Sequence, residues 1–143
     1  MRFGLPVAYL DQLVWRPGWV MATREDIAEK MGEALAPPAW ILDNALTRDW
    51  PRAVEAADLI IWLDYPTWLC LFRVLKRILS SWRQVRPDMA DGCPEQWDLE
   101  FLVWIAGWRR SHRPKLLPLL EGRAKTLVFR RAKELETWLR TLP

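Results

Sequence analysis

Histidine and cysteine are scarce in this sequence of 143 residues, which contains one histidine and two cysteines. A zinc site needs several of these side chains at close spacing, so the sequence predicts no metal ligands. Cys70 and Cys93 are too few for a disulfide framework, and we expect two free thiols. His112 stands alone among basic residues, which favours a surface position over a catalytic role.

Long apolar runs are also missing. The two longest, Trp68–Phe72 and Leu99–Trp108, are much shorter than the ~20 residues that a membrane span needs. The chain does not open with the charged and then apolar segment of a secretion signal. We therefore expect a cytoplasmic protein that does not enter a membrane.

The composition, 51% apolar and 27% charged, is that of a globular protein, and its length suits one domain over residues 1–143. The charge is divided unevenly. Residues 1–64 hold 6 basic and 10 acidic side chains, whereas residues 65–143 hold 15 basic and 8 acidic ones. This asymmetry indicates either a phosphate-bearing partner for the second half or a solvated basic helix face.

Apolar segments alternate with helical patterns along the chain. The segment 59–64 is continuously apolar before its final aspartate, as in a strand that is buried on both faces of a parallel sheet. Strands separated by helices predict an α/β fold with a parallel sheet flanked by helices. The pattern predicts strands at 7–10, 40–43, 59–64 and 126–129, and helices from Thr23 and over 51–57, 66–82, 95–113, 115–120 and 132–139.

Several segments resemble the bacterial DNA topology modulation protein family (FlaR-like), a branch of the adenylate-kinase-like P-loop fold. The resemblance covers nearly the whole chain in the family's order. It rests on the segments LPVAYLDQLVWRPGW (5–19), WILDN (40–44), ADLIIWLDYPTWLCLFRVLKR (57–77), RPDMADGCPE (86–95) and DLEFLVWI (98–105).

The resemblance implies a P-loop nucleoside or nucleotide kinase, with ATP and Mg²⁺ as cofactors and a small molecule as phosphate acceptor. It also implies a helical lid at about residues 78–113. In this fold the first strand lies in the centre of the sheet, between the strands that correspond to 40–43 and 59–64.

The ATP-binding loop of that family does not occur in this sequence. The loop reads G-x-x-x-x-G-K-S/T and leads from a strand into a helix. The six glycines stand at positions 4, 18, 32, 92, 107 and 122, and none directly precedes a lysine; the segment 122–126 leads into a strand instead. The family's glycine and tyrosine after the aspartate at 43 are also replaced. We therefore expect an N-terminally truncated or degenerate kinase-like protein that lacks the first central strand, is inactive as given and has no cofactor-binding residues.

Four residues are candidates for catalysis by this resemblance. Asp11 follows the first strand, where it would orient the acceptor or help to deprotonate it; the alternative is a turn aspartate. Arg77, Arg83 and Arg86 are candidate lid arginines, because a guanidinium stays charged and grips phosphate oxygens in pairs. The alternative for these three is an exposed basic loop.

Four further residues are candidates for substrate binding. Asp43 would lie near the magnesium ion and the phosphates, with a turn aspartate as the alternative, and Arg48 could contact an acceptor phosphate. Trp15 and Trp19 could form an aromatic wall for a base or sugar, although packing is the favoured role. Asp64, by contrast, is expected to cap the helix that follows it.

A non-enzymatic module that binds nucleotides or nucleic acid remains the alternative function. Residues 109–133 hold nine basic side chains and one acidic one. A basic segment of this kind attracts phosphates, but the sequence contains no established nucleic-acid-binding motif.

Overall fold

The computed structural model describes residues 4–43, 51–120 and 125–142, in which short parallel sheets are flanked by helices, so the coarse α/β prediction is confirmed. The chain divides into two compact units. Unit 1 comprises residues 1–46 and 77–97, and unit 2 comprises residues 47–76 and 98–143. The P-loop kinase fold and a single domain over 1–143 stay predictions.

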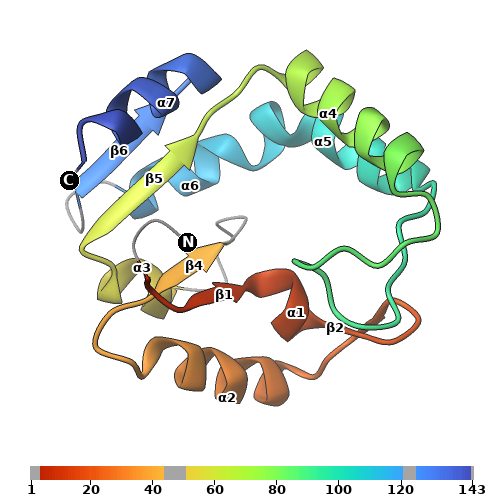
Figure 1. Cartoon of the computed structure of the whole chain (residues 1–143), viewed down its shortest axis with the longest axis horizontal. Coiled ribbons are helices and arrows are strands. Elements are labelled where there is room, and N and C mark those ends of the chain that lie inside the picture. Colours follow the sequence, from red (N-terminus) through yellow and green to blue (C-terminus); the bar gives the residue numbers. More distant parts are fainter. Residues whose placement is uncertain (1–3, 44–50, 121–124, 143) are drawn as a thin grey trace. The chain divides into compact units, whose positions relative to one another are not determined.

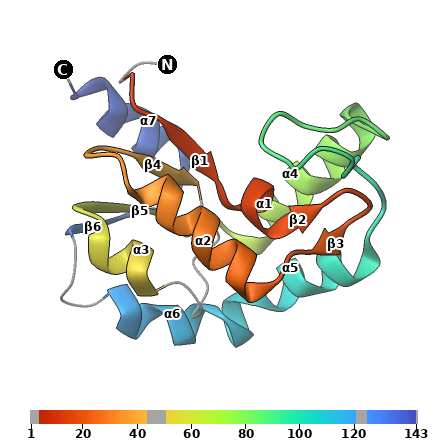
Figure 2. The same cartoon turned by 90° about the horizontal axis from the view of Figure 1, so that it is seen from below.

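The sheet of unit 1 consists of two parallel strands, β1 (Val7–Tyr9) and β4 (Ile41–Asp43). The short helix α1 (Leu10–Val14) follows β1 directly, and α2 (Arg24–Leu35) runs alongside both strands (Figure 2). The Thr23 side chain accepts a hydrogen bond from the backbone N–H of Asp26, which confirms the predicted helix start. Ile27 and Met31, one helical turn apart, are buried.

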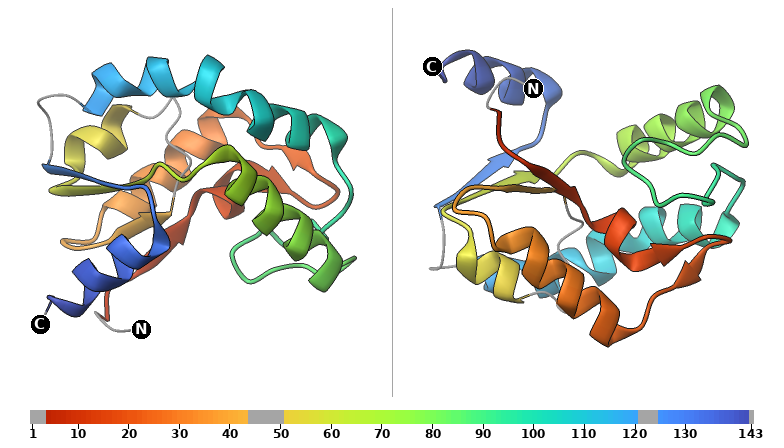
Figure 3. Two further views of the ribbon diagram at one scale, coloured as in Figure 1. Left: turned by 90° about the horizontal axis from the view of Figure 1, so that it is seen from above. Right: turned by 60° about the horizontal axis from the view of Figure 1, so that its bottom comes forward.

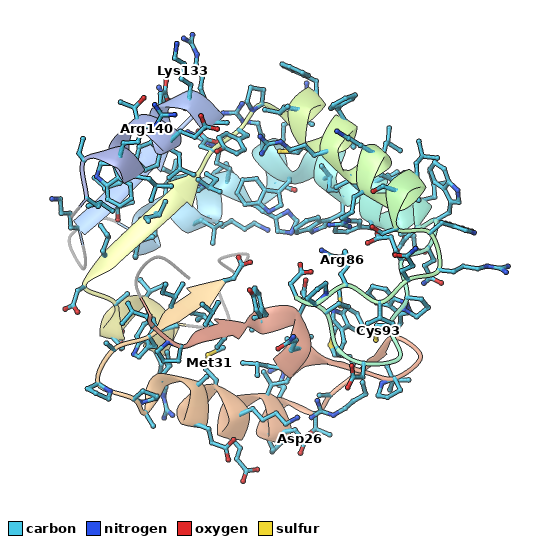
Figure 4. All side chains as sticks on the ribbon, in the orientation of Figure 1. Asp26, Met31, Arg86, Cys93, Lys133 and Arg140 are labelled. Atoms are coloured by element: carbon cyan, nitrogen blue, oxygen red, sulfur yellow. The ribbon has the colours of Figure 1, made fainter. Side chains whose placement is uncertain are left out.

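A small antiparallel hairpin of β2 (Trp15–Arg16) and β3 (Val20–Met21) completes unit 1. It packs against the segment between α4 and α5, on which Figure 4 labels Arg86 and Cys93. The backbone N–H of Gly18 donates to the carbonyl of Gly92 at 2.9 Å. The sequence predicted only the turn at residues 17–18, because two-residue strands carry no periodic pattern.

The sheet of unit 2 pairs β5 (Leu59–Leu63) with β6 (Lys125–Phe129), again in parallel (Figure 1). The strand β6 continues into α7 (Ala132–Arg140), and Phe129 packs against Trp138 of that helix. The remaining elements that contribute to this unit are α3 (Pro51–Ala56), α4 (Thr67–Ser80), which extends into unit 1 at its end, α5 (Leu99–Ser111) and α6 (Arg113–Leu120). Figure 3 shows α6 following α5 almost directly.

The strand β5 differs from its prediction, because only one of its faces is buried. Ile60 and Trp62 are buried, whereas Leu59, Ile61 and Leu63 are 40–46% exposed. Among the described strands, only β6 pairs with β5. In unit 1, likewise, β1 is the only described strand that pairs with β4. Among the described strands, β4 and β5 therefore each have an edge without a partner.

None of the described helices is long and apolar enough to cross a membrane.

Candidate functional site at the carboxyl end of β1 and β4

Asp11 and Asp43 lie at the same edge of the unit 1 sheet. The parallel register pairs Tyr9 with Asp43, and Asp11 follows two residues after Tyr9 in the first turn of α1. Carboxyl ends of parallel strands form the ligand-binding edge of such sheets. The fold therefore brings together two residues that the sequence analysis had placed at separate strand ends.

Partial loss of hydration raises the pKa of Asp11, although the residue remains exposed. The guanidinium of Arg86 opposes this rise, and the carboxylates of Asp88 and Asp43 add to it. Arg77 also opposes it, more weakly. A carboxyl whose pKa is raised by its surroundings binds protons more readily than an ordinary surface aspartate, which suits proton exchange with a ligand.

The two arginines that act on Asp11 are held by a buried carboxylate, Glu95, which is 6% exposed. Arg77 donates from Nη2 to Oε1 of Glu95 at 3.1 Å. Its Nε lies 3.0 Å from Oε2, but this N–H does not point at the oxygen, so the second contact is an ion pair without a hydrogen bond. Arg86 forms an ion pair with Oε2 through Nε at 3.0 Å and donates from Nη1 to Asp88 at 2.6 Å.

Glu95 is itself fixed by the backbone. Its N–H donates to the carbonyl of Gln84 at 2.9 Å, and its carbonyl accepts from the N–H of Arg83 at 3.0 Å. These bonds close the segment between the end of α4 and Glu95 into a loop. The guanidiniums of Arg77 and Arg86 are therefore positioned by ion pairs and backbone bonds within unit 1.

The other predicted site residues lie differently. Arg83 is exposed, has a backbone φ of 60°, and its side chain forms no hydrogen bond or ion pair with the described residues. Arg48 lies outside the described residues. Trp15 and Trp19 meet edge to face, with ring centroids 5.6 Å apart, and pack against the buried cluster of Met89, Ala90 and Cys93.

The indole N–H of Trp19 donates to the carbonyl of Pro94 at 3.2 Å, so both tryptophans serve packing, the role that the sequence analysis favoured. Cys93 is almost completely buried in the same cluster, and its thiol donates to the carbonyl of Arg16 at 3.1 Å. Both cysteines are free thiols, as predicted.

Glu95 was not among the site residues predicted from the sequence. The sequence analysis placed Glu95 only at the start of the predicted helix 95–113, whereas α5 begins at Leu99, and the partner of Glu95, Arg77, is 18 residues away. The site as a whole holds the carboxylates Asp11, Asp43, Asp88 and Glu95 and the two guanidiniums. This excess of negative charge suits a ligand that donates hydrogen bonds, such as a sugar hydroxyl, more than a bare phosphate.

The described residues do not fit MgATP. They contain no group of three or more His, Cys, Asp or Glu side chains that could hold a metal ion. The sequence offers no G-x-x-x-x-G-K-S/T loop for the phosphates.

Comparison with known proteins gives no match: no family model, no curated protein sequence and no solved structure matches this chain.

Proposed function

We propose that this protein is a kinase-like protein that binds a small hydroxyl-bearing acceptor, a nucleoside or nucleotide, at the carboxyl end of β1 and β4. The observation that carries this proposal is the position of Asp11 beside Asp43 and Arg86 at a parallel sheet edge, with a raised pKa. The resemblance to the topology modulation family supplies the class of acceptor. By this proposal the chain as given binds the acceptor but does not transfer a phosphoryl group from ATP.

Asp11 would act by accepting a hydrogen bond from an acceptor hydroxyl. In a complete transfer reaction such a carboxylate would also take the hydroxyl proton as the phosphorus–oxygen bond forms. Arg86 would keep part of the carboxyl population ionised, because its positive charge lowers the pKa that burial raises. Glu95 would position Arg86 and is not expected to touch the ligand.

The test is a calorimetric titration of the protein with nucleosides and nucleoside monophosphates, together with an assay for phosphoryl transfer from MgATP. We expect binding of at least one nucleoside, no transfer, and about tenfold weaker binding after Asp11→Asn, which removes a charged hydrogen-bond acceptor. Asp91→Asn serves as the matched control, because Asp91 is an exposed aspartate of the same unit. Binding should also weaken as the pH falls below the raised pKa of Asp11.

Two results would contradict the proposal. If no nucleoside or nucleotide binds, or if the Asp11 and Asp91 variants behave alike, the acceptor site is wrong. If the chain transfers a phosphoryl group from ATP, the proposal that it is inactive is wrong. ATP would then be bound by residues other than a P-loop.

A further inference from the structure

We infer that unit 2 contains a separate binding site for a phosphate group, formed by three arginines around Asp64. The parallel register of the sheet pairs Leu63 with Phe129 at the ends of β5 and β6. Asp64 and Arg130 are the next residues along each strand, so they meet at the carboxyl edge of this second sheet. That edge is where ligands bind in parallel α/β sheets.

Two further arginines reach Asp64 from the end of α5 and the start of α6. Arg109 donates from Nη2 to both carboxylate oxygens, at 3.1 and 3.2 Å. Arg113 donates from Nε to both oxygens at 3.2 and 3.3 Å, and from Nη2 to Oδ2 at 3.0 Å. The Nε of Arg130 lies 3.8 Å from Oδ2. Asp64 accepts these bonds in place of the helix-capping role that its sequence position predicted.

This cluster carries more positive than negative charge. Asp64, whose side chain is 1% exposed, supplies one negative charge to three guanidiniums. A buried carboxylate with two arginines could be a purely structural ion cluster. Such a structural cluster does not require a third arginine. Arg130 is 71% exposed, and its contact with Asp64 is too long for a hydrogen bond. Positive charge is therefore left for a ligand at the sheet edge.

The arginines are also held in place before any ligand arrives. The guanidinium of Arg113 lies over the ring of Trp62, 5.3 Å from its centroid. Its Nη2 is also held by the hydrogen bond to Asp64. Among the described residues Arg109 donates only through Nη2, to Asp64, which leaves its Nε and Nη1 donors for another acceptor. Several planar donors at one point suit a tetrahedral oxyanion with two negative charges, and a phosphate monoester is such a group.

This inference does not rest on the proposed function, since it uses none of the residues of unit 1. The experiment measures the midpoint of thermal unfolding, and the dissociation constant by calorimetry, with inorganic phosphate and with glycerol 3-phosphate. Chloride at matched ionic strength is the reference in both arms. We expect both phosphates to raise the midpoint beyond the effect of chloride, and a preference for glycerol 3-phosphate would identify an ester as the source of the phosphate.

Arg130→Gln is the decisive variant, because its exposed side chain can be replaced without disturbing the buried carboxylate. We expect phosphate to bind about tenfold to a hundredfold more weakly to it. Lys133→Gln is the matched control; it removes a positive charge three residues away, from a side chain that points outward from α7 (Figure 4). Asp11→Asn should leave phosphate binding unchanged, which separates this site from the one in unit 1.

The inference is overturned if phosphate acts no more strongly than chloride, or if Arg130→Gln and Lys133→Gln bind phosphate equally well. It is also overturned if single-stranded DNA or RNA binds with a steep salt dependence while both small phosphates fail to bind. That last result would identify the basic segment as a nucleic acid surface instead.

Discussion

Gly92 lies so close to Pro17 that a Cβ atom added to Gly92 would come within 2.8 Å of the Cβ of Pro17. The φ of Gly92 is also +73°, a conformation that other residues adopt only at a cost. This contact joins the hairpin of β2 and β3 to the segment that carries Arg86 and Glu95. The close approach explains why glycine is needed at this position.

Gly92→Ala should therefore destabilise the protein by about 1–3 kcal/mol, from strain at positive φ and the clash with Pro17. Gly32→Ala is the matched control, because Gly32 lies within α2 and an added Cβ meets nothing within 4 Å. It should stabilise the protein by about 0.5–1 kcal/mol, the usual gain of alanine over glycine in a helix. Urea unfolding of both variants measures the two effects, and equal effects would contradict the contact.

Glu95→Gln should cost about 3–5 kcal/mol, because it leaves two arginines without their buried negative partner. Asp88→Asn removes a partly exposed carboxylate that also pairs with Arg86 and should cost less than about 1 kcal/mol. Urea unfolding again gives both values. A small effect of Glu95→Gln would show that Glu95 does not hold the arginines.

Asp11→Asn should raise the stability of the free protein at neutral pH. The folded state raises the pKa of Asp11 above its unfolded value, so the folded state binds more protons between these two pKa values. Stability then falls as the pH rises through this window, and above it the ionised carboxyl is penalised in full. The gain from Asp11→Asn should be largest above the folded pKa and vanish below the unfolded one. Thermal melts across the acidic range test this, and a gain that is independent of pH would contradict it.

Ile61→Lys should reduce self-association. Ile61 is 42% exposed on a strand whose second edge has no partner among the described strands, and such apolar edges favour strand-to-strand aggregation. Val20→Lys is the control, since Val20 is also exposed but lies on the hairpin of unit 1. Light scattering over a range of protein concentrations should show less association for Ile61→Lys than for Val20→Lys and the parent protein.

Cys70 should react slowly with thiol reagents in the native protein. Burial raises the pKa of its thiol, more than the neighbouring Arg73 and Arg109 lower it, so little thiolate is present at neutral pH. The almost fully buried Cys93 should also be slow. Titration with a chromogenic disulfide should show two slow thiols in buffer and two fast ones in denaturant. A fast thiol in buffer would contradict the raised pKa of Cys70 or the burial of Cys93.

Local features of the fold could be predicted from the sequence, whereas features that depend on distant residues could not. Thr23 begins α2 as predicted, because a capping side chain bonds to a backbone N–H only three residues away. The strand β5 was placed correctly, but its burial on both faces was wrong, since coverage of a strand depends on which other elements pack on it. The role of Asp64 was missed because its partners Arg109 and Arg113 lie 45 and 49 residues away.

In the candidate site, too, local features could be predicted from the sequence and long-range contacts could not. Asp11 and Asp43 could be proposed because each follows a recognisable strand, and the parallel register then brings their strand ends together. Their electrostatic coupling to Arg86 depends on a loop without periodic pattern, which Glu95 fixes through two backbone bonds. No spacing rule in the sequence indicates that arrangement.

The pairing of β5 with β6 also bears on how the protein is made. The strand β6 begins at Lys125, far along the chain from the end of β5 at Leu63, so β5 is synthesised well before its hydrogen-bonding partner leaves the ribosome. During that interval the run Leu59–Leu63 has neither of its edges paired within unit 2. Strand pairing over such a sequence separation is slow, because the intervening chain must first be ordered. The nascent protein should therefore depend on chaperones that shield apolar strands until β6 has been synthesised.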